Sequence, residues 1–285
     1  MSSRQGSSGV PGGQAEAAWG RADRASRRAE SEVANAERHE RLFAENGRDL
    51  HASMALRHRA VAERHRTTAR LQRAYAVRLT EAETEGGRRP LFMAGVAEAC
   101  GTPSVALTLV GADLSQLAVA ASDRPARGAQ DLEYVLTDGP AHDAVRDRRT
   151  VYASGAALER RWPGYGSGLA ALGLRSVAAL PLAVLSECIG ALVVFDPPAS
   201  LARAGTFREV ADALAQGVLI GPDADPGLYG GTDLRSVVHQ AAGVLSEQSR
   251  SSVDDALALI KARAFTLSVP VETVAQSVIS GELRL

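Results

Sequence analysis

Several residue types and patterns are scarce in this 285-residue chain, and each scarcity excludes a class of protein. Cysteine occurs twice, as Cys100 and Cys188, without CxxC spacing. This excludes a disulfide scaffold and a thiolate metal cluster, and it fits a reducing cytoplasm. No stretch approaches about eighteen apolar residues free of charge, so we expect no membrane span. The first residues, MSSRQGSSGVPGGQ, lack the apolar run of a signal peptide, and we expect a cytoplasmic protein.

An excess of charge and a catalytic motif are also missing. The formal net charge is −1, so any electrostatic preference for nucleic acid or acidic membranes must be local. Lys261 is the only lysine. We find no GxSxG, Walker loop, HExxH or paired acid-base signature. We therefore expect no catalytic residues, no metal site and no cofactor, and we do not expect an enzyme.

The N-terminal third has helical composition after a short tail. Residues 1–14 are mostly Gly, Ser, Pro and Gln and are expected to be disordered. Residues 15–87 are dominated by alanine, arginine and glutamate, a composition that favours helices. Asn46 and Gly47 are expected to break this segment into one helix at 15–45 and another at 49–85.

The second helix carries a seven-residue repeat, HASMALR, HRAVAER, HRTTARL and QRAYAVR. Ala55, Ala62, Ala69 and Ala76 form one column, and a sustained period of seven keeps such a column facing a partner helix. The repeat predicts either a helical hairpin or a dimeric coiled coil. We expect a homodimer that forms through the N-terminal helices.

Histidines and arginines of this helix allow two further interpretations. His51, His58 and His65 are seven residues apart, about 10 Å along the axis, which is too far for one helix to bind one ion. Seven arginines and a single glutamate, Glu63, lie between residues 50 and 80. Such a basic helix could contact RNA phosphates, or it could be the solvated face of a stalk.

Residues 88–220 alternate between helical and strand patterns. Strands are predicted at 104–110 and 116–122 and in TVYAS, RSVAALPLAV and ECIGALVVFD. Helices are predicted at 126–136, in AHDAVRDRR and at about 201–218. Short turns between successive strands predict hairpins, and therefore a mixed or antiparallel sheet.

This region resembles a GAF domain. The resemblance depends on AASD, TDGPAHDAV, VYAS followed by RRWPGYGSGLAALGLRSVAALPL, and CIGALVVFD. It implies a central antiparallel sheet with flanking helices and a pocket over one face, where some family members bind a small molecule. Trp162, Tyr165 and His142 are the candidate pocket residues. Alternatively, Trp162 and Tyr165 anchor their loop on the core and His142 lies on a helix surface.

A linker and three short helices follow. Residues 221–232, GPDADPGLYGGT, are rich in glycine and proline and predict the linker. Residues 233–285 then show helical spacing in LRSVVHQAAGVLSEQ, VDDALALIKARAF and VPVETVAQSVIS. The expected boundary residues are Asp233 as the first N-cap, Ser251 or Ser252 as the second, Ser268 near the third start and Gly281 at its end.

The three helices resemble an ANTAR domain. The matching positions are Val238, Gln240, Ala241, Gly243, Val244 and Leu245; Ala256, Ile260, Lys261, Arg263, Ala264 and Phe265; and Val271, Val274, Ala275 and Val278. The resemblance implies that this segment binds paired hairpins in nascent RNA, usually as a dimer, and prevents a terminator from forming. The small residues, Gly243 included, are interpreted as core positions where helices cross closely.

Polar positions then have to supply the RNA contacts. Arg235, His239, Lys261 and Arg263 are the candidates for phosphates, and Gln240, Thr273 and Gln276 are the candidates for loop bases. The alternative for each is a solvated surface residue. The segment has five basic residues and six acids, so RNA binding would need dimerisation or help from the basic helix.

The sequence thus predicts an α+β multidomain protein with long N-terminal helices in a coiled coil, a GAF-like antiparallel sheet with flanking helices, and a C-terminal three-helix ANTAR bundle. Its expected function is signal-responsive transcription antitermination, with RNA hairpins as partners. An unknown small-molecule ligand in the GAF-like domain is a further possible partner. The alternative is a protein-interaction regulator or a small-molecule sensor whose bundle does not bind RNA.

Overall fold

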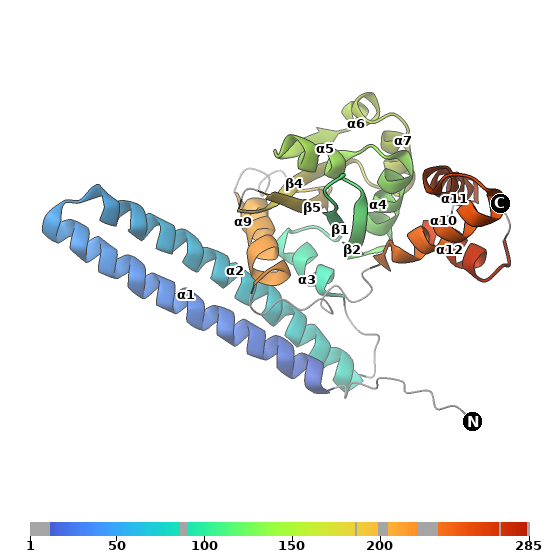
Figure 1. Cartoon of the computed structure of the whole chain (residues 1–285). Helices are drawn as coiled ribbons and strands as arrows, with labels where there is room; N and C mark the ends of the chain where they lie inside the picture. The colour runs from blue at the N-terminus through green and yellow to red at the C-terminus, as the bar shows by residue number, and fades with distance from the viewer. Residues whose placement is uncertain are drawn as a thin grey trace.

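The computed structural model describes residues 12–85, 91–185, 187–198, 205–221, 233–267 and 269–283. These residues form a helical hairpin (12–85), an α/β unit (91–221) and a C-terminal bundle (233–283). The hairpin and the bundle lie on opposite sides of the α/β unit (Figure 1). Nearly all of the expected tail and linker lie outside the described residues, but residues 12–14 begin the first helix. No helix in the described ranges combines the length and the apolar character that crossing a membrane requires.

The hairpin consists of α1 (Gly12–Asn46) and α2 (Asp49–Glu85), which confirms the break predicted at Asn46 and Gly47. Gly47 has φ +63°, a conformation that residues with a Cβ rarely adopt. The alanine column of α2 is buried where α2 packs along α1, whose own buried residues are also alanines. The alanine column of α2 therefore packs against α1 of the same chain, and the two helices form a hairpin. A homodimer through these helices stays a prediction.

The hairpin shares a hydrophobic core with the α/β unit. The second half of α2 packs on α3 (Phe92–Ala99), α9 (Thr206–Ala213) and the π-helical η1 (Leu214–Leu219). Tyr75 meets Phe92 edge to face, with ring centroids 5.5 Å apart. A Cβ added at Gly217 would lie 2.2 Å from Thr68 Oγ1, so η1 and α2 approach closely because Gly217 has no side chain. The predicted helix at 201–218 is found from residue 206 onward; residues 201–204 lie outside the described ranges.

The sheet is antiparallel at every pairing between described strands, in the order β3-β4-β5-β1-β2-β6. Both predicted hairpins are confirmed. Gly190 lies opposite β1, and a Cβ there would come within 2.0 Å of the carbonyl oxygen of Thr108, so only glycine allows this spacing. The strands are β1 (Val105–Val110), β2 (Gln116–Ala121), β3 (Val151–Ser154), β4 (Ser176–Val184), β5 (Glu187–Phe195) and β6 (Asp233–Leu234).

Helices cover both faces of the sheet. The hairpin, α3, α9 and η1 pack on one face. The other face carries α4 (Arg124–Leu136), α5 (Pro140–Asp147), α6 (Ala156–Arg161) and α7 (Tyr165–Ala171). Asp123 caps α4 by accepting a hydrogen bond from the backbone of Ala126, at 2.8 Å.

The bundle contains α10 (Ser236–Ser249), α11 (Val253–Leu267) and α12 (Val271–Ile279). Ser252 caps α11 as predicted, because its hydroxyl accepts from the backbone N–H of Asp255 at 3.0 Å. The predicted cap at Asp233 was wrong, since Asp233 pairs with Val119 in β6 and α10 begins three residues later. Pro270 precedes α12 as its N-cap, and the start predicted near Ser268 lies outside the described residues.

The core of the bundle corrects one further prediction. Ala241, Ala256, Ala264 and Ala275 are buried as expected. Gly243 is exposed, and a Cβ added there would meet nothing within 4 Å. The buried face of α10 includes the neighbouring Ala242 instead, so close helix crossing does not require glycine at position 243.

Candidate functional site

Arg235 joins the bundle to the α/β unit. It lies between β6 and α10, and its backbone N–H donates to the carbonyl of Leu117 in β2 at 3.0 Å. Its side chain is 0% exposed. Arg235 therefore does not lie on the surface in this arrangement, because strand pairing at the sheet edge places the residue beneath the bundle, and its predicted contact with RNA phosphates stays a prediction.

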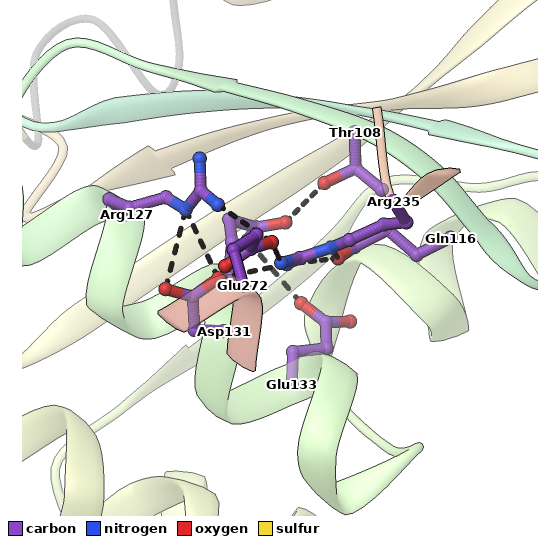
Figure 2. Close-up of polar contacts among 8 residues, drawn as sticks. Thr108, Gln116, Arg127, Asp131, Glu133, Arg235 and Glu272 are labelled. Carbon is purple, nitrogen blue, oxygen red and sulfur yellow. Dashed lines mark hydrogen bonds and ion pairs between the residues drawn. The ribbon is translucent and has the colours of Figure 1, made fainter. Parts of the chain in front are cut away.

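Three parts of the chain bind the guanidinium of Arg235 (Figure 2). It donates to Gln116 Oε1 at 2.7 Å, to Asp131 Oδ1 at 2.8 Å, and to Glu272. Arg127 pairs with Asp131 at 3.1 Å and with Glu272 at 3.0 Å. The two arginines and two carboxylates thus form a closed cluster of alternating charge that links α4 to α12.

This cluster contains the buried guanidinium of Arg235, whose positive charge would destabilise the fold if no carboxylate lay beside it. Burial lowers the pKa of Arg235, and the nearby Asp131 counteracts this effect. A guanidinium stays protonated in proteins, so the residue remains cationic and depends on its partners. Removing one member of such a buried pair leaves the other uncompensated, which typically costs about 3–5 kcal/mol. The docking of the bundle therefore depends on the ion pairs that Arg235 makes with Asp131 and Glu272.

Tyr134 lies between two cations of the bundle. The guanidinium carbon of Arg235 lies 4.3 Å from the centroid of its ring, and Lys261 Nζ lies 4.0 Å from the same centroid. Burial, with a contribution from Arg235, lowers the pKa of Lys261 to about 8. Lys261 was predicted to contact RNA, but in this arrangement it is half-buried against α4 rather than free at the surface.

A cavity of about 240 Å³ lies beside Tyr134, between β1, α4, α5 and the bundle. Of the three predicted pocket residues, only His142 lines it. Trp162 and Tyr165 are 1% and 0% exposed and belong to the core of the α/β unit, so the alternative interpretation applies to them. The side chains that matter most for its chemistry are Glu133, Tyr134, His142, His239 and Lys261.

Glu133 is an uncharged group in the wall of this cavity at neutral pH. Burial raises its pKa to about 8, against the opposing effect of hydrogen bonds from the backbone of α5. One of these runs from the N–H of His142 to Glu133 Oε1, at 2.8 Å. Gly139 makes room for this arrangement, since a Cβ there would lie 2.6 Å from Glu133 Cδ.

The raised pKa predicts how stability depends on pH. Between pH 4.5 and 8, Glu133 is ionised in the unfolded chain but protonated in the folded one, so stability falls as pH rises. Replacing Glu133 with Gln removes this effect. We expect the stability of Glu133→Gln relative to wild type to increase across that window and to level off above pH 8. Urea unfolding at several pH values measures it, and a difference independent of pH would contradict the prediction.

Among the described residues, one group that includes His142 has the spacing of a metal site. Asp138, His142 and Asp143 bring three ligand atoms within 4.8 Å of one another. However, Asp143 already accepts from Arg146, Arg161 and Trp162 at 2.6, 3.0 and 3.2 Å, so its oxygens are occupied.

Three histidines also meet in the hairpin, where His39 of α1 lies between His51 and His58 of α2. His39 Nδ1 is 3.0 Å from His51 Nδ1, and the rings of His39 and His58 stack at 5.4 Å. His58 Nδ1 is bonded to Glu32 at 2.6 Å. Spacing along one helix did not reveal this cluster, because one of its three histidines, His39, comes from α1.

The remaining predicted RNA contacts lie at the surface of the bundle. His239 and Gln240 on α10, Arg263 on α11, and Thr273 and Gln276 on α12 are all exposed. The structure therefore separates the predicted set into exposed residues and the two interface residues, Arg235 and Lys261. No residue near Arg235 or Lys261 in the sequence indicates that either side chain would lie at this interface.

Comparison with known proteins does not identify the chain: no protein-family model matches it, and no curated protein sequence matches it.

Proposed function

We propose that this protein is a signal-responsive regulator of transcription termination whose C-terminal bundle binds RNA hairpins and is restrained by docking on the α/β unit. The observation that carries the proposal is the burial of Arg235 and the half-burial of Lys261 against α4. Both are cationic residues of the bundle. Releasing the bundle would expose them near Arg263, and positive charge is the main source of RNA affinity.

The exposed polar side chains of the bundle support contacts with RNA bases as well as with RNA phosphates. Gln240, Thr273 and Gln276 are exposed amide and hydroxyl side chains that can donate and accept hydrogen bonds at unpaired bases. The charge balance of the bundle also changes on release. In the docked form, Asp131 of α4 pairs with Arg235, and release would separate Arg235 from this carboxylate. The released bundle, rather than the docked one, is the form proposed to bind RNA.

A comparison of docked and released proteins tests this proposal. Tyr134→Ala removes the ring that contacts both Arg235 and Lys261, and it changes no residue of the bundle itself. Each cation–π contact is worth about 0.5–2 kcal/mol, so we expect affinity for a hairpin RNA selected from a random library to rise about tenfold. Gel-shift titration at fixed salt measures the affinity. Asp131→Asn, a second variant on α4, is expected to act in the same direction.

Removing an exposed positive charge from the bundle tests where the RNA binds. In the Tyr134→Ala background, Arg263→Ala is expected to weaken binding and to reduce the salt dependence by about one phosphate contact. Arg208→Ala removes the same charge from α9, on the other side of the α/β unit, and serves as the matched control. If neither wild type nor Tyr134→Ala enriches any hairpin, the proposal fails. The alternative, a small-molecule sensor without RNA binding, is then favoured by the cavity.

A further inference from the structure

Polar groups without partners surround the cavity under the bundle. Among the described residues, no carboxylate forms an ion pair with Lys261, whose ammonium lies 4.0 Å from the centroid of the Tyr134 ring. His142 Nδ1 and the Tyr134 hydroxyl are buried without a hydrogen-bond partner, and Tyr134 is only 6% exposed. Buried polar atoms are nearly always paired, so unpaired ones around a cavity point to a missing partner.

The charge and size of the cavity limit what that partner can be. Glu133 is protonated at neutral pH, so it does not repel an anion and can donate a proton to one. Asp113 also lines the cavity, but it is exposed and its carboxylate accepts from both the hydroxyl and the N–H of Ser115, at 2.7 and 3.1 Å. Val110, Leu114 and Leu257 supply apolar walls. A volume of about 240 Å³ is below the roughly 300–1,000 Å³ of typical ligand sites.

We infer that this cavity binds a small molecule that carries an oxyanion, a carboxylate or a phosphate, with the anion between Lys261 and His239 of the bundle and His142 of the α/β unit. The compact remainder of the molecule lies against the apolar walls. The anion compensates the ammonium of Lys261 and accepts from an imidazole N–H, and the donors come from both sides of the interface.

Such a ligand would stabilise the docked arrangement. A molecule that contacts both the bundle and the α/β unit binds the docked form more tightly than the released form, and it shifts the equilibrium by that difference. This regulatory step rests on the proposed function, because it represses RNA binding only if the released bundle binds RNA. The binding step does not rest on it and is tested separately.

The single lysine makes the binding test specific. Lysine labelled with ¹³C at Cε places one side-chain label in the whole chain, so one NMR signal reports on Lys261. The probes are benzoate and inorganic phosphate, with neutral benzamide as the uncharged control. We expect benzoate or phosphate to shift this signal in a saturable titration and to raise the pKa of Lys261. Benzamide is expected to bind at least tenfold more weakly than benzoate.

Two variants and a control complete the test. Lys261→Gln and His142→Ala are each expected to weaken binding of the anion at least tenfold by calorimetry. Arg263→Gln removes an exposed charge two residues away, outside the cavity, and is expected to leave the affinity unchanged. Equal affinity for benzoate and benzamide, or unchanged anion affinity in both variants, overturns the inference. Binding of only one anion supports it and distinguishes a carboxylate from a phosphate ligand.

The failure of this inference and that of the proposed function are distinguishable. RNA selection with Tyr134→Ala uses no anion, so its result stands independently of the titrations. If RNA is enriched and anions bind, adding the anion should weaken RNA binding by wild type and have little effect on Tyr134→Ala. If RNA is enriched but no anion binds, only the inference about the cavity is overturned.

Discussion

Arg235→Met is expected to lower the free energy of unfolding by about 3–5 kcal/mol, because it removes the fully buried one of the two cations that Asp131 and Glu272 share. Methionine fills a similar volume, so the loss of charge is the main change. Arg127 still contacts both carboxylates, but it cannot replace the bonds to Gln116 that Arg235 makes at 2.7 and 3.0 Å. Urea unfolding followed by circular dichroism measures the total loss. Hydrogen exchange of the α10, α11 and α12 amides shows whether the bundle is released first.

Two further variants make this prediction specific to the buried cluster. Arg263→Met changes the same residue type at an exposed site of the bundle, and a surface substitution typically alters stability by less than about 0.5 kcal/mol. Combining Arg235→Met with Arg127→Met, Asp131→Leu and Glu272→Leu removes all four charges of the cluster, and should recover much of the loss because apolar groups can replace a buried ion cluster. A loss for Arg235→Met no larger than that for Arg263→Met would refute the docking role.

Trp162→Ala is expected to cost about 3–5 kcal/mol of stability, as large truncations in a packed core do. The indole is 1% exposed, its ring centroid is 6.0 Å from that of Tyr165, and its N–H donates to Asp143 at 3.2 Å. The sequence allowed a second role, in which Trp162 lines a ligand pocket. A pocket residue would lose ligand affinity on truncation with a smaller effect on folding. Thermal or urea unfolding therefore discriminates between the two roles.

Trp162→Phe is the matched control for this substitution. It keeps an aromatic ring in the core and removes the hydrogen bond to Asp143, which Arg146 and Arg161 continue to pair with. We expect a smaller loss than for Trp162→Ala, on the order of 1–2 kcal/mol for a hydrogen bond and part of the ring. Benzoate affinity of the folded fraction should be unchanged in both variants. A loss of anion binding in Trp162→Phe with full stability would instead place Trp162 at the ligand.

Local features of the chain were predictable because they depend on neighbours in sequence. The break at Gly47 follows from a residue that tolerates positive φ, and the cap at Ser252 follows from a hydroxyl three residues before an acid. The strands and their hairpins were predicted from alternating or continuous apolar runs joined by short turns. Even the heptad repeat of α2 correctly required a helical partner, although it did not say whether the partner was α1 or another chain.

Positions that depend on the other parts of the chain could not be predicted in this way. An arginine before a polar helix is ordinarily at the surface, and nothing near Arg235 in sequence indicates Gln116, Asp131 or Glu272 as its partners. The same reasoning applies to His39, which reaches His51 and His58 only because α1 and α2 fold back on each other. Side chains that are far apart in the sequence are brought together by tertiary packing. The spacing of residues along the sequence does not show which of them will meet.

The sequence by itself determined the order and type of most elements and both hairpins of the sheet, because these follow from periodicity, turns and caps. Only the tertiary structure decided which cationic side chains are exposed to a binding partner and which are buried. It buries Arg235 in a charge cluster and places Lys261, the single lysine, over Tyr134 at the edge of a cavity. The physical reason is that a charge is buried only where its partners converge, and here they come from β2, α4 and α12.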